Sequence, residues 1–206
     1  MSKVIVVGGG AAGMMASIAA AGAGDEVTLI EKNEKLGKKL FITGKGRCNV
    51  TNSSDIETIF SNINRNPKFM YSALESYDNN DIIRDIESEG CKVKEERGGR
   101  MFPVSDHSSD VIRALSNMLE KAGVEVRLRS EVKKLSKTEN GFEVTLSSGK
   151  KENADAVVVA TGGVSYAATG STGDGFEFAK GFGHTVTDLK PSLVPLVTSD
   201  GWCKDL

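Results

Sequence analysis

Three glycines near the start of the chain are spaced so that a phosphate could approach the backbone. Gly8, Gly10 and Gly13 form a G-x-G-x-x-G pattern within KVIVVGGGAAGMMASIAAAGAGDEVTLIEK, and Glu31 closes the segment. In this pattern the glycines permit, in order, a tight turn, close approach of a pyrophosphate, and close packing of a helix on a sheet. An acid at the end of the second strand accepts the hydroxyls of a ribose. We expect a strand–helix–strand unit over residues 3–31 that binds the ADP half of a dinucleotide; the alternative is a plain structural turn.

A second candidate site follows an apolar segment near residue 160. The sequence DAVVVATGG, residues 155–163, predicts a strand in the middle of a parallel sheet that ends in a turn of small residues. A β-meander over roughly residues 124–155 precedes it. A glycine turn, a long excursion, a meander and then an ATG turn are typical of FAD-binding chains, whereas simple NAD dehydrogenases continue directly through alternating strands and helices. The alternative is an ordinary strand-to-loop turn.

A third candidate site is the loop over residues 36–52, LGKKLFITGKGRCNVTN. Its glycines would let the backbone approach a flat ring or a phosphate, and its cations would stabilise a pyrophosphate or a reduced, anionic flavin. The alternative is a solvated basic loop. A Walker-type phosphate loop is excluded because the G-K-[ST] spacing and a directly preceding strand are both missing.

The remaining sequence predicts the elements that position these sites. Helical spacing covers roughly residues 67–89, and a β-hairpin follows with Gly98-Gly99 near its turn. A helix capped by Ser108 or Ser109 ends at Gly123. Asn140-Gly141 predicts a second hairpin, within the meander. The expected fold is an α/β, Rossmann-like FAD/NAD(P)-binding domain with a β-meander and an inserted helical and hairpin segment.

Composition and charge narrow the classes of function that this protein can have. The net charge of −2 over 206 residues gives no general case for nucleic acid, and no apolar run approaches the ~20 residues that span a membrane. The first strand is predicted to begin at Lys3, and on this ground we expect no signal peptide. Three scattered cysteines, Cys48, Cys91 and Cys203, fit free thiols in a reducing cytoplasm. No spacing predicts a metal cluster or a nucleophile–His–acid constellation, so no metal site and no catalytic residue is assigned.

Four motifs together identify a family. The segments are TGKGRCNVTN (43–52), GRMFPVSDHSSDV (99–111), VVATGGVSYAATGSTGDGFEFA (158–179) and GHTVTDLKPSLVPL (183–196). In this order they resemble the BaiN-type bacterial NAD(P)/FAD-dependent oxidoreductases, a family of aminoacetone-oxidase-like flavoproteins. Two departures are mild: Lys45 stands where many members have glycine, and Ala167 where proline is usual.

The resemblance implies FAD as cofactor, with NAD(P)H or an organic substrate as hydride donor. It also implies a small-molecule substrate of unknown identity. We expect cofactor contacts at the residues of the three candidate sites and at a residue of the meander, namely Gly8, Gly10, Ala11, Ala12, Gly13, Glu31, Lys32, Lys39, Gly44, Gly46, Arg47, Cys48, Asn49, Val132, Ala160, Thr161, Gly162 and Gly163.

The resemblance also carries an expectation about length. Family members run to about twice this size, so residues 1–190 are predicted to be the N-terminal part of the FAD-binding domain and residues 191–206 the start of a second, inserted domain. The chain alone should then hold FAD poorly, lack turnover and tend to self-associate through an uncovered sheet edge. The Gly173-Asp174 pair is expected to cap a helix instead of holding a ribitol, because no apolar strand precedes it.

Two other functions stay open. One is an NAD(P)-binding dehydrogenase with a single dinucleotide site, and the other is an FAD-binding module of the kind that serves tRNA modification. A dithiol mechanism at Cys48 is disfavoured because no second cysteine lies near it in sequence. His107, near a helix start, and His184, after a helix end, are interpreted as structural.

Overall fold

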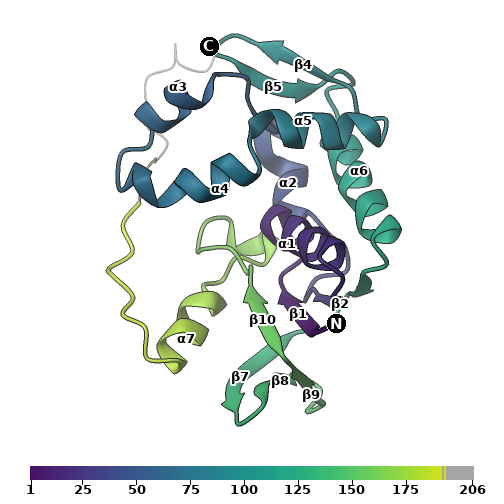
Figure 1. The fold of residues 1–206 in the computed structure, drawn as a ribbon, viewed down its shortest axis with the longest axis vertical. Coiled ribbons are helices and arrows are strands. Elements are labelled where there is room, and N and C mark those ends of the chain that lie inside the picture. Colours follow the sequence, from purple (N-terminus) through teal and green to yellow (C-terminus); the bar gives the residue numbers. More distant parts are fainter. Residues whose placement is uncertain (192, 194–206) are drawn as a thin grey trace, which may run out of the picture.

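The centre of the protein is a four-stranded parallel sheet. The computed structural model describes residues 1–191 and 193, and within them the sheet has the order β10–β1–β2–β6 (Figure 1). β1 pairs in parallel with both β2 and β10, and β2 pairs in parallel with β6. The helix α1 connects β1 to β2, as the glycine pattern predicts. The fold is therefore the expected Rossmann-like α/β domain.

Twenty elements make up the described chain. The strands are β1 (Lys3–Val7), β2 (Glu26–Ile30), β3 (Thr51–Asn52), β4 (Val93–Glu96), β5 (Arg100–Pro103), β6 (Glu125–Arg127), β7 (Val132–Thr138), β8 (Gly141–Leu146), β9 (Lys151–Ala154) and β10 (Ala156–Val159). The α-helices are α1 (Ala11–Gly22), α2 (Lys38–Ile42), α3 (Ile56–Ser61), α4 (Tyr71–Ser76), α5 (Asn79–Ser88), α6 (Ser108–Lys121) and α7 (Asp174–Gly181). Short 3-10 helices are η1 (Thr43–Gly46), η2 (Pro67–Met70) and η3 (Ala167–Thr169).

The central sheet separates two hydrophobic cores, which explains why its first strand is apolar from Val4 to Val7. Val4 and Val6 face one core, built with α1, α5 and α6. Ile5 and Val7 face the other, which is built largely from the meander β7–β8–β9. Alternate residues of a strand point to opposite faces, so a strand covered on both sides needs apolar residues at every position.

The two predicted hairpins are confirmed. β4 and β5 pair across a turn at Gly98-Gly99, where both glycines have positive φ. β7 and β8 pair across the turn before Gly141, and β9 completes an antiparallel sheet that lies at the opposite end of the molecule from β4 and β5 (Figure 1). The predicted meander begins later than expected, because β6 joins the parallel sheet instead.

The strand over residues 155–163 was predicted to lie in the middle of the parallel sheet. Among the described residues this prediction is wrong. β10 lies at the edge of the sheet there, hydrogen-bonded to β1 alone, and Val159 at its end is 44% exposed. The apolar run has a second cause besides a central position, because both faces of β10 pack on a core, one through Val158 and the other through Val157. The expected apolar sheet edge is present, and self-association through it stays a prediction.

The start of α6 also differs from expectation. His107 is the N-cap residue, without a side-chain cap, while the buried hydroxyl of Ser108 donates to the carbonyl of Phe41, 2.9 Å away. Ser108 thus ties α6 to α2 instead of capping its own helix. The predicted end of the helix is confirmed, since Gly123 follows it with a φ of +72°.

Two predictions fall on residues that are not described. Cys203 lies outside the described residues, and so does the predicted start of a second domain at 191–206, apart from Pro191 and Leu193. Among the helices that are described, none is both long enough and apolar enough to cross a membrane.

Candidate dinucleotide site

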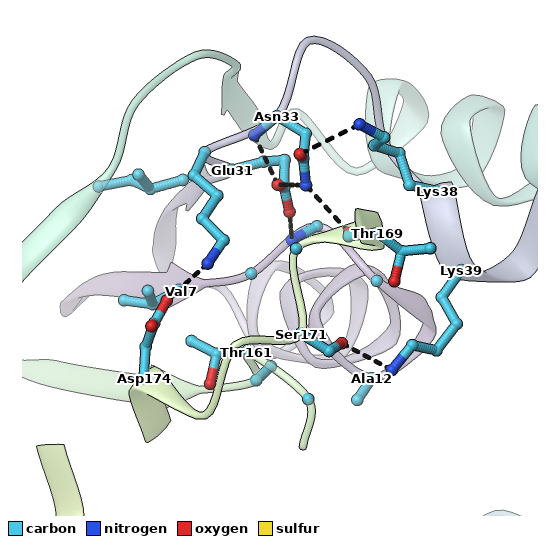
Figure 2. A pocket seen from close by; sticks show the side chains of 18 of the residues that line it. Val7, Ala12, Glu31, Asn33, Lys38, Lys39, Thr161, Thr169, Ser171 and Asp174 are labelled. Atoms are coloured by element: carbon cyan, nitrogen blue, oxygen red, sulfur yellow. Dashed lines mark hydrogen bonds and ion pairs between the residues drawn. The ribbon is translucent and has the colours of Figure 1, made fainter. Parts of the chain in front are cut away.

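A cavity of about 530 Å³ lies where β1, β2 and β10 end. The carboxyl edge of a parallel sheet is where open α/β folds bind ligands, and the volume is within the range of small-molecule sites. The cavity walls come from five parts of the chain, and Figure 2 labels residues from four of them. The five parts are residues 7–12, 30–33, 38–43, 130–132 and 159–178, and the lining residues among them are Val7, Gly8, Gly9, Gly10, Ala11, Ala12, Ile30, Glu31, Lys32, Asn33, Lys38, Lys39, Leu40, Thr43, Ser130, Glu131, Val132, Val159, Ala160, Thr161, Gly162, Thr169, Gly170, Ser171, Asp174 and Phe178.

Each glycine of the turn has the geometry that its predicted role requires. Gly8 has a φ of +111°, and a Cβ there would lie 2.5 Å from the carbonyl oxygen of Ala160. A Cβ on Gly13 would overlap the carbonyl oxygen of Gly8, so the helix can approach the strand only with glycine at that position. Gly10 differs from both, because nothing lies within 4 Å of a Cβ built on it and its φ of −84° suits any residue. Gly10 is therefore required by neither backbone conformation nor packing, and the open space beside it belongs to the cavity.

The start of α1 offers unpaired donors to this space. Gly10 is the N-cap residue and has no side chain to satisfy the first N–H groups, and the first turn carries no acidic residue. The N–H groups of the first turn of a helix lack partners within the helix, and together with the helix dipole they attract an anion. The helix start that lines the cavity is thus electrically suited to a phosphate.

Glu31 is buried, at 7% exposure, and is held by the protein itself. Its Oε2 accepts from the Gly9 N–H at 2.6 Å, and its Oε1 accepts from the backbone N–H and the side-chain Nδ2 of Asn33 at 2.7 and 2.6 Å. A carboxylate has about four acceptor positions, so about one is left for a ligand. The residue is therefore a structural anchor of the glycine turn as well as a candidate ribose ligand, and its ribose contact stays a prediction.

The structure brings eleven of the predicted cofactor residues together around the cavity. These are Gly8, Gly10, Ala11, Ala12, Glu31, Lys32, Lys39, Val132, Ala160, Thr161 and Gly162. Gly13 lies behind the turn, against Gly8. Six others do not line the cavity: Gly44, Gly46, Arg47, Cys48, Asn49 and Gly163. For these seven residues a cofactor contact stays a prediction without support from the cavity.

The loop over residues 43–49 packs away from the cavity because its side chains have other partners. Arg47 donates to Glu96 at 2.7 Å and to Asp106 at 3.3 Å, and its guanidinium lies 4.2 Å from the ring centre of Phe102. Cys48 is buried in the core, and this burial raises the pKa of its thiol. A thiol with a raised pKa is a poor nucleophile, so Cys48 is a packing residue in this arrangement. The cavity reaches only Thr43 at the start of the loop.

Several lining residues were missed from the sequence. Asn33, Ser171 and Asp174 all line the cavity, and each hydrogen-bonds to another wall residue or its neighbour. Asn33 lies two residues after Glu31, whose carboxylate accepts from both its backbone N–H and its side-chain amide. Asp174 begins α7 after Gly173, as expected for a helix start, but its contact with Lys32 joins residues 142 positions apart and has no local signal. Among the described residues, no group of three or more His, Cys, Asp or Glu side chains is arranged to hold a metal ion.

Comparison with known proteins identifies the domain. The model of the HI0933-like protein Rossmann domain family matches residues 2–201. A 3-dehydro-bile acid delta(4,6)-reductase from Clostridium scindens is 34% identical over 198 residues, which are 95% of this chain and 47% of that protein. A ribosomal RNA dihydrouridine synthase from Escherichia coli is 36% identical over 191 residues, 93% of this chain and 47% of that protein. The chain thus spans about half the length of these curated relatives.

A solved structure supports the same fold. The open conformation of a flavocytochrome c3 fumarate reductase matches with a TM-score of 0.63 and 24% sequence identity, over 87% of this chain and 40% of that one. At this identity the likeness concerns the fold alone.

Proposed function

The chain belongs to the HI0933-like Rossmann domain family, and from this premise we propose that it is the FAD-binding part of a flavin-dependent oxidoreductase of the BaiN type. The single observation that carries the proposal is the open cradle at Gly10. It lies at an uncapped helix start, faces a cavity of about 530 Å³, and sits between Glu31 and the Ala160–Thr161–Gly162 turn.

The residues present fit the ADP half of the cofactor. A pyrophosphate needs backbone N–H donors and no side chain in its path, which Gly10, Ala11 and Ala12 provide. Two ammonium groups, those of Lys32 and Lys39, lie on the cavity wall and would add charge-assisted bonds to an anion. Glu31 would accept from a ribose hydroxyl through its remaining acceptor position.

Bound FAD supplies hydride transfer, and the protein supplies binding and orientation. The backbone at residues 8–12 would fix the phosphates. Ser130, Glu131 and Val132, which follow β6, would form the wall opposite the ATG turn. The ligand would thus be held along one edge of the sheet, and its reacting ring would extend past the residues that line the cavity.

The substrate class that we favour is a small molecule with an activated carbon–carbon double bond. The names of the two relatives, a delta(4,6)-reductase and a dihydrouridine synthase, both describe the reduction of such a bond. For this protein the reaction would add a hydride to one carbon and a proton to the other, with NAD(P)H as the candidate source of electrons.

A second candidate substrate is a uridine base in RNA. It rests on the Escherichia coli relative and on a similarly named protein from Haemophilus influenzae, which is 31% identical over 197 residues. The net charge of −2 offers no general attraction to phosphate backbones, and for this reason we rank it second.

The test uses the protein at its full length, of which this chain supplies the dinucleotide fold. It should purify with visible flavin absorbance, and the released cofactor should be FAD. A colourless protein that binds NAD(P) would favour the single-site dehydrogenase and overturn the proposal. After anaerobic reduction, reoxidation by an unsaturated ketone but not by a uridine-containing RNA would select the first substrate class, and the reverse result would select the second.

A further inference from the structure

One wall of the cavity is held to the residue 31–39 stretch by side-chain hydrogen bonds. Residues 169–174, with the sequence TGSTGD, follow η3 and contribute Thr169, Gly170, Ser171 and Asp174 to the lining. The segment passes in front of the start of α1, opposite the residue 31–39 stretch (Figure 2). We call residues 169–174 the clasp.

Three side chains of the residue 31–39 stretch hold the clasp. The Lys39 Nζ donates to the Ser171 hydroxyl at 2.6 Å. The Lys32 Nζ donates to Asp174 Oδ2 and to the Thr172 hydroxyl, both at 2.7 Å. The Asn33 Nδ2 donates to the carbonyl oxygen of Thr169 at 3.2 Å, and the same Nδ2 donates to Glu31.

These contacts are separable from the fold. Within residues 1–191 and 193, no backbone–backbone hydrogen bond joins the clasp to the residue 31–39 stretch, so side chains make every hydrogen bond between them. Side-chain contacts of this kind can be broken without loss of the backbone hydrogen bonds of any strand or helix. They belong to the part of a structure that opens with a low free energy.

The clasp nevertheless fits closely against two walls. A Cβ on Gly170, which has a φ of +99°, would lie 2.5 Å from Asn33 Nδ2. A Cβ on Gly162 in the ATG turn would lie 2.8 Å from the Ser171 hydroxyl. Glycine at both positions lets the clasp approach the Glu31–Asn33 pair on one side and the ATG turn on the other.

The ammonium group of Lys39 also has N–H donors that no described residue accepts. In the described residues its ammonium has the neutral Ser171 hydroxyl as its hydrogen-bond partner, and an ammonium has three donors. Two donors are left on a cation that lines the cavity. A phosphate entering beside Gly10 could therefore be bound while the contact to Ser171 persists.

We propose that Lys32, Asn33 and Lys39 are positioning residues that hold the clasp over the bound dinucleotide, so that occupancy of the cavity and closure of the clasp stabilise each other. The proposal rests on the proposed function for the identity of the ligand. Its structural half, that these side chains keep the clasp closed, is independent of which dinucleotide binds. A ligand that contacts both walls gains from a clasp that is already closed, and the clasp gains from the ligand in the same measure.

The test is hydrogen exchange of peptides that cover residues 166–176 in the cofactor-free chain. The Lys32→Met/Lys39→Met variant should exchange roughly tenfold faster there, with exchange in β1 and α1 unchanged. Lys180→Met is the matched control, because within the described residues Lys180 bonds only to Glu177 on the surface of α7, and it should change nothing. Lys32→Arg/Lys39→Arg should restore slow exchange.

Added ADP separates this proposal from the function on which it rests. ADP should slow exchange in the clasp of the unmodified chain further, and this coupling should be lost in the double methionine variant. ADP protection at residues 8–12 with no effect on the clasp would overturn the proposal and leave the function standing. Absence of any ADP protection in the full-length protein, with the lysine effect present, would leave the structural half of the proposal and overturn the function on which its other half rests.

A second variant guards against a folding defect. Ser171→Ala/Asp174→Ala removes the Lys39–Ser171 and Lys32–Asp174 contacts from the other side and must accelerate exchange in the same residues. Unchanged exchange in both double variants would show that the clasp does not depend on these lysines.

Discussion

The glycine turn at residues 8–13 and the loop at residues 43–49 look alike in sequence but differ in structure. Both are rich in glycine, and both are predicted to contact a cofactor. The turn lines the cavity, whereas the loop lies against Phe102 of β5, with Arg47 bound to Glu96 of β4 and to Asp106 in the turn before α6. The difference is one of context. The turn is fixed between a buried strand and a helix, while Arg47 of the loop is neutralised by acids that only the tertiary fold brings near.

A motif therefore locates a site when its neighbours in sequence also fix its geometry. The three glycines of the turn occupy positions defined by β1, α1 and β10, which are all visible as patterns. The loop has no such frame, because its position depends on a hairpin about fifty residues later. The following substitutions test whether this contrast is real.

The largest effect is expected at Gly13. Even alanine would place a Cβ onto the carbonyl oxygen of Gly8, so Gly13→Ala should destabilise the fold by about 3 kcal/mol or more. Gly22→Ala, on the same helix with open space around it, should be neutral or stabilise by roughly 0.5 kcal/mol. Thermal unfolding followed by circular dichroism measures both, and equal midpoints would contradict the packing assigned to the turn.

Gly10→Val should lose the ligand and keep the fold. A valine Cβ meets nothing within 4 Å, and the backbone φ of −84° tolerates it, but the side chain would project into the cavity. We expect ADP affinity to fall by more than roughly 100-fold, about 3 kcal/mol, with an unchanged unfolding midpoint. Tight ADP binding by this variant, measured by calorimetry, would show that Gly10 does not face the phosphates.

Glu31→Gln should weaken both binding and stability. The amide would place an N–H₂ group against the N–H donors of Gly9 or Asn33, which the carboxylate now accepts at 2.6–2.7 Å. Loss of a charge-assisted bond costs about 1.5–3 kcal/mol, so the unfolding midpoint and the ADP affinity should fall together. A fall in affinity alone would assign Glu31 to the ribose and not to the turn.

Arg47→Met should lower the stability of the fold and leave ADP binding nearly unchanged, whereas a change in the cavity wall should mainly lower ADP affinity. Its partners are Glu96, Asp106 and the ring of Phe102, so the unfolding midpoint should fall modestly while ADP affinity changes less than about twofold. Lys39→Met, in the cavity wall, should lower ADP affinity with little change in the midpoint. If Arg47→Met is the variant that loses ADP, the loop contacts the ligand after all.

The smallest expected effect is that of low pH on the contact between Asp174 and Lys32. Burial alone would raise the pKa of the Asp174 carboxyl, but hydrogen bonds from Lys32 and Thr172, and the more distant charge of Lys133, hold that pKa below its usual value. A carboxyl with a depressed folded pKa stabilises its contact at higher pH and loses it as pH falls through the folded value. Exchange in residues 169–174, corrected for intrinsic rates, should accelerate only below pH about 4. Acceleration near pH 6 would mean that another group controls the segment.

Much of the fold was predictable because local signals carried it. The residue 3–31 unit, both hairpins and the end of α6 at Gly123 follow from glycine spacing, alternation and helical periodicity. The edge position of β10 was not predictable, since a strand half-covered by two cores shows the same apolar run as a central one. The N-cap of α6 was missed because Ser108 bonds across to Phe41, a tertiary contact.

The site was predictable to the same extent. Most residues attached directly to the ends of β1, β2 and β10 were found, although Gly9 and Asn33 were not, and Ser171 and Asp174 were missed as cavity residues. Their partners, Lys39 and Lys32, lie more than 130 positions away, and hydrogen bonds at that separation leave no periodic trace in a single sequence.

The most direct test of the account is a map of ADP protection on the chain by hydrogen exchange. Besides the clasp, we predict slower exchange at four sets of residues, namely 8–12, 31–33, 130–132 and 160–162, and no change at residues 44–49. Protection at residues 44–49 without protection at residues 8–12 would contradict the assignment of the cavity as the dinucleotide site.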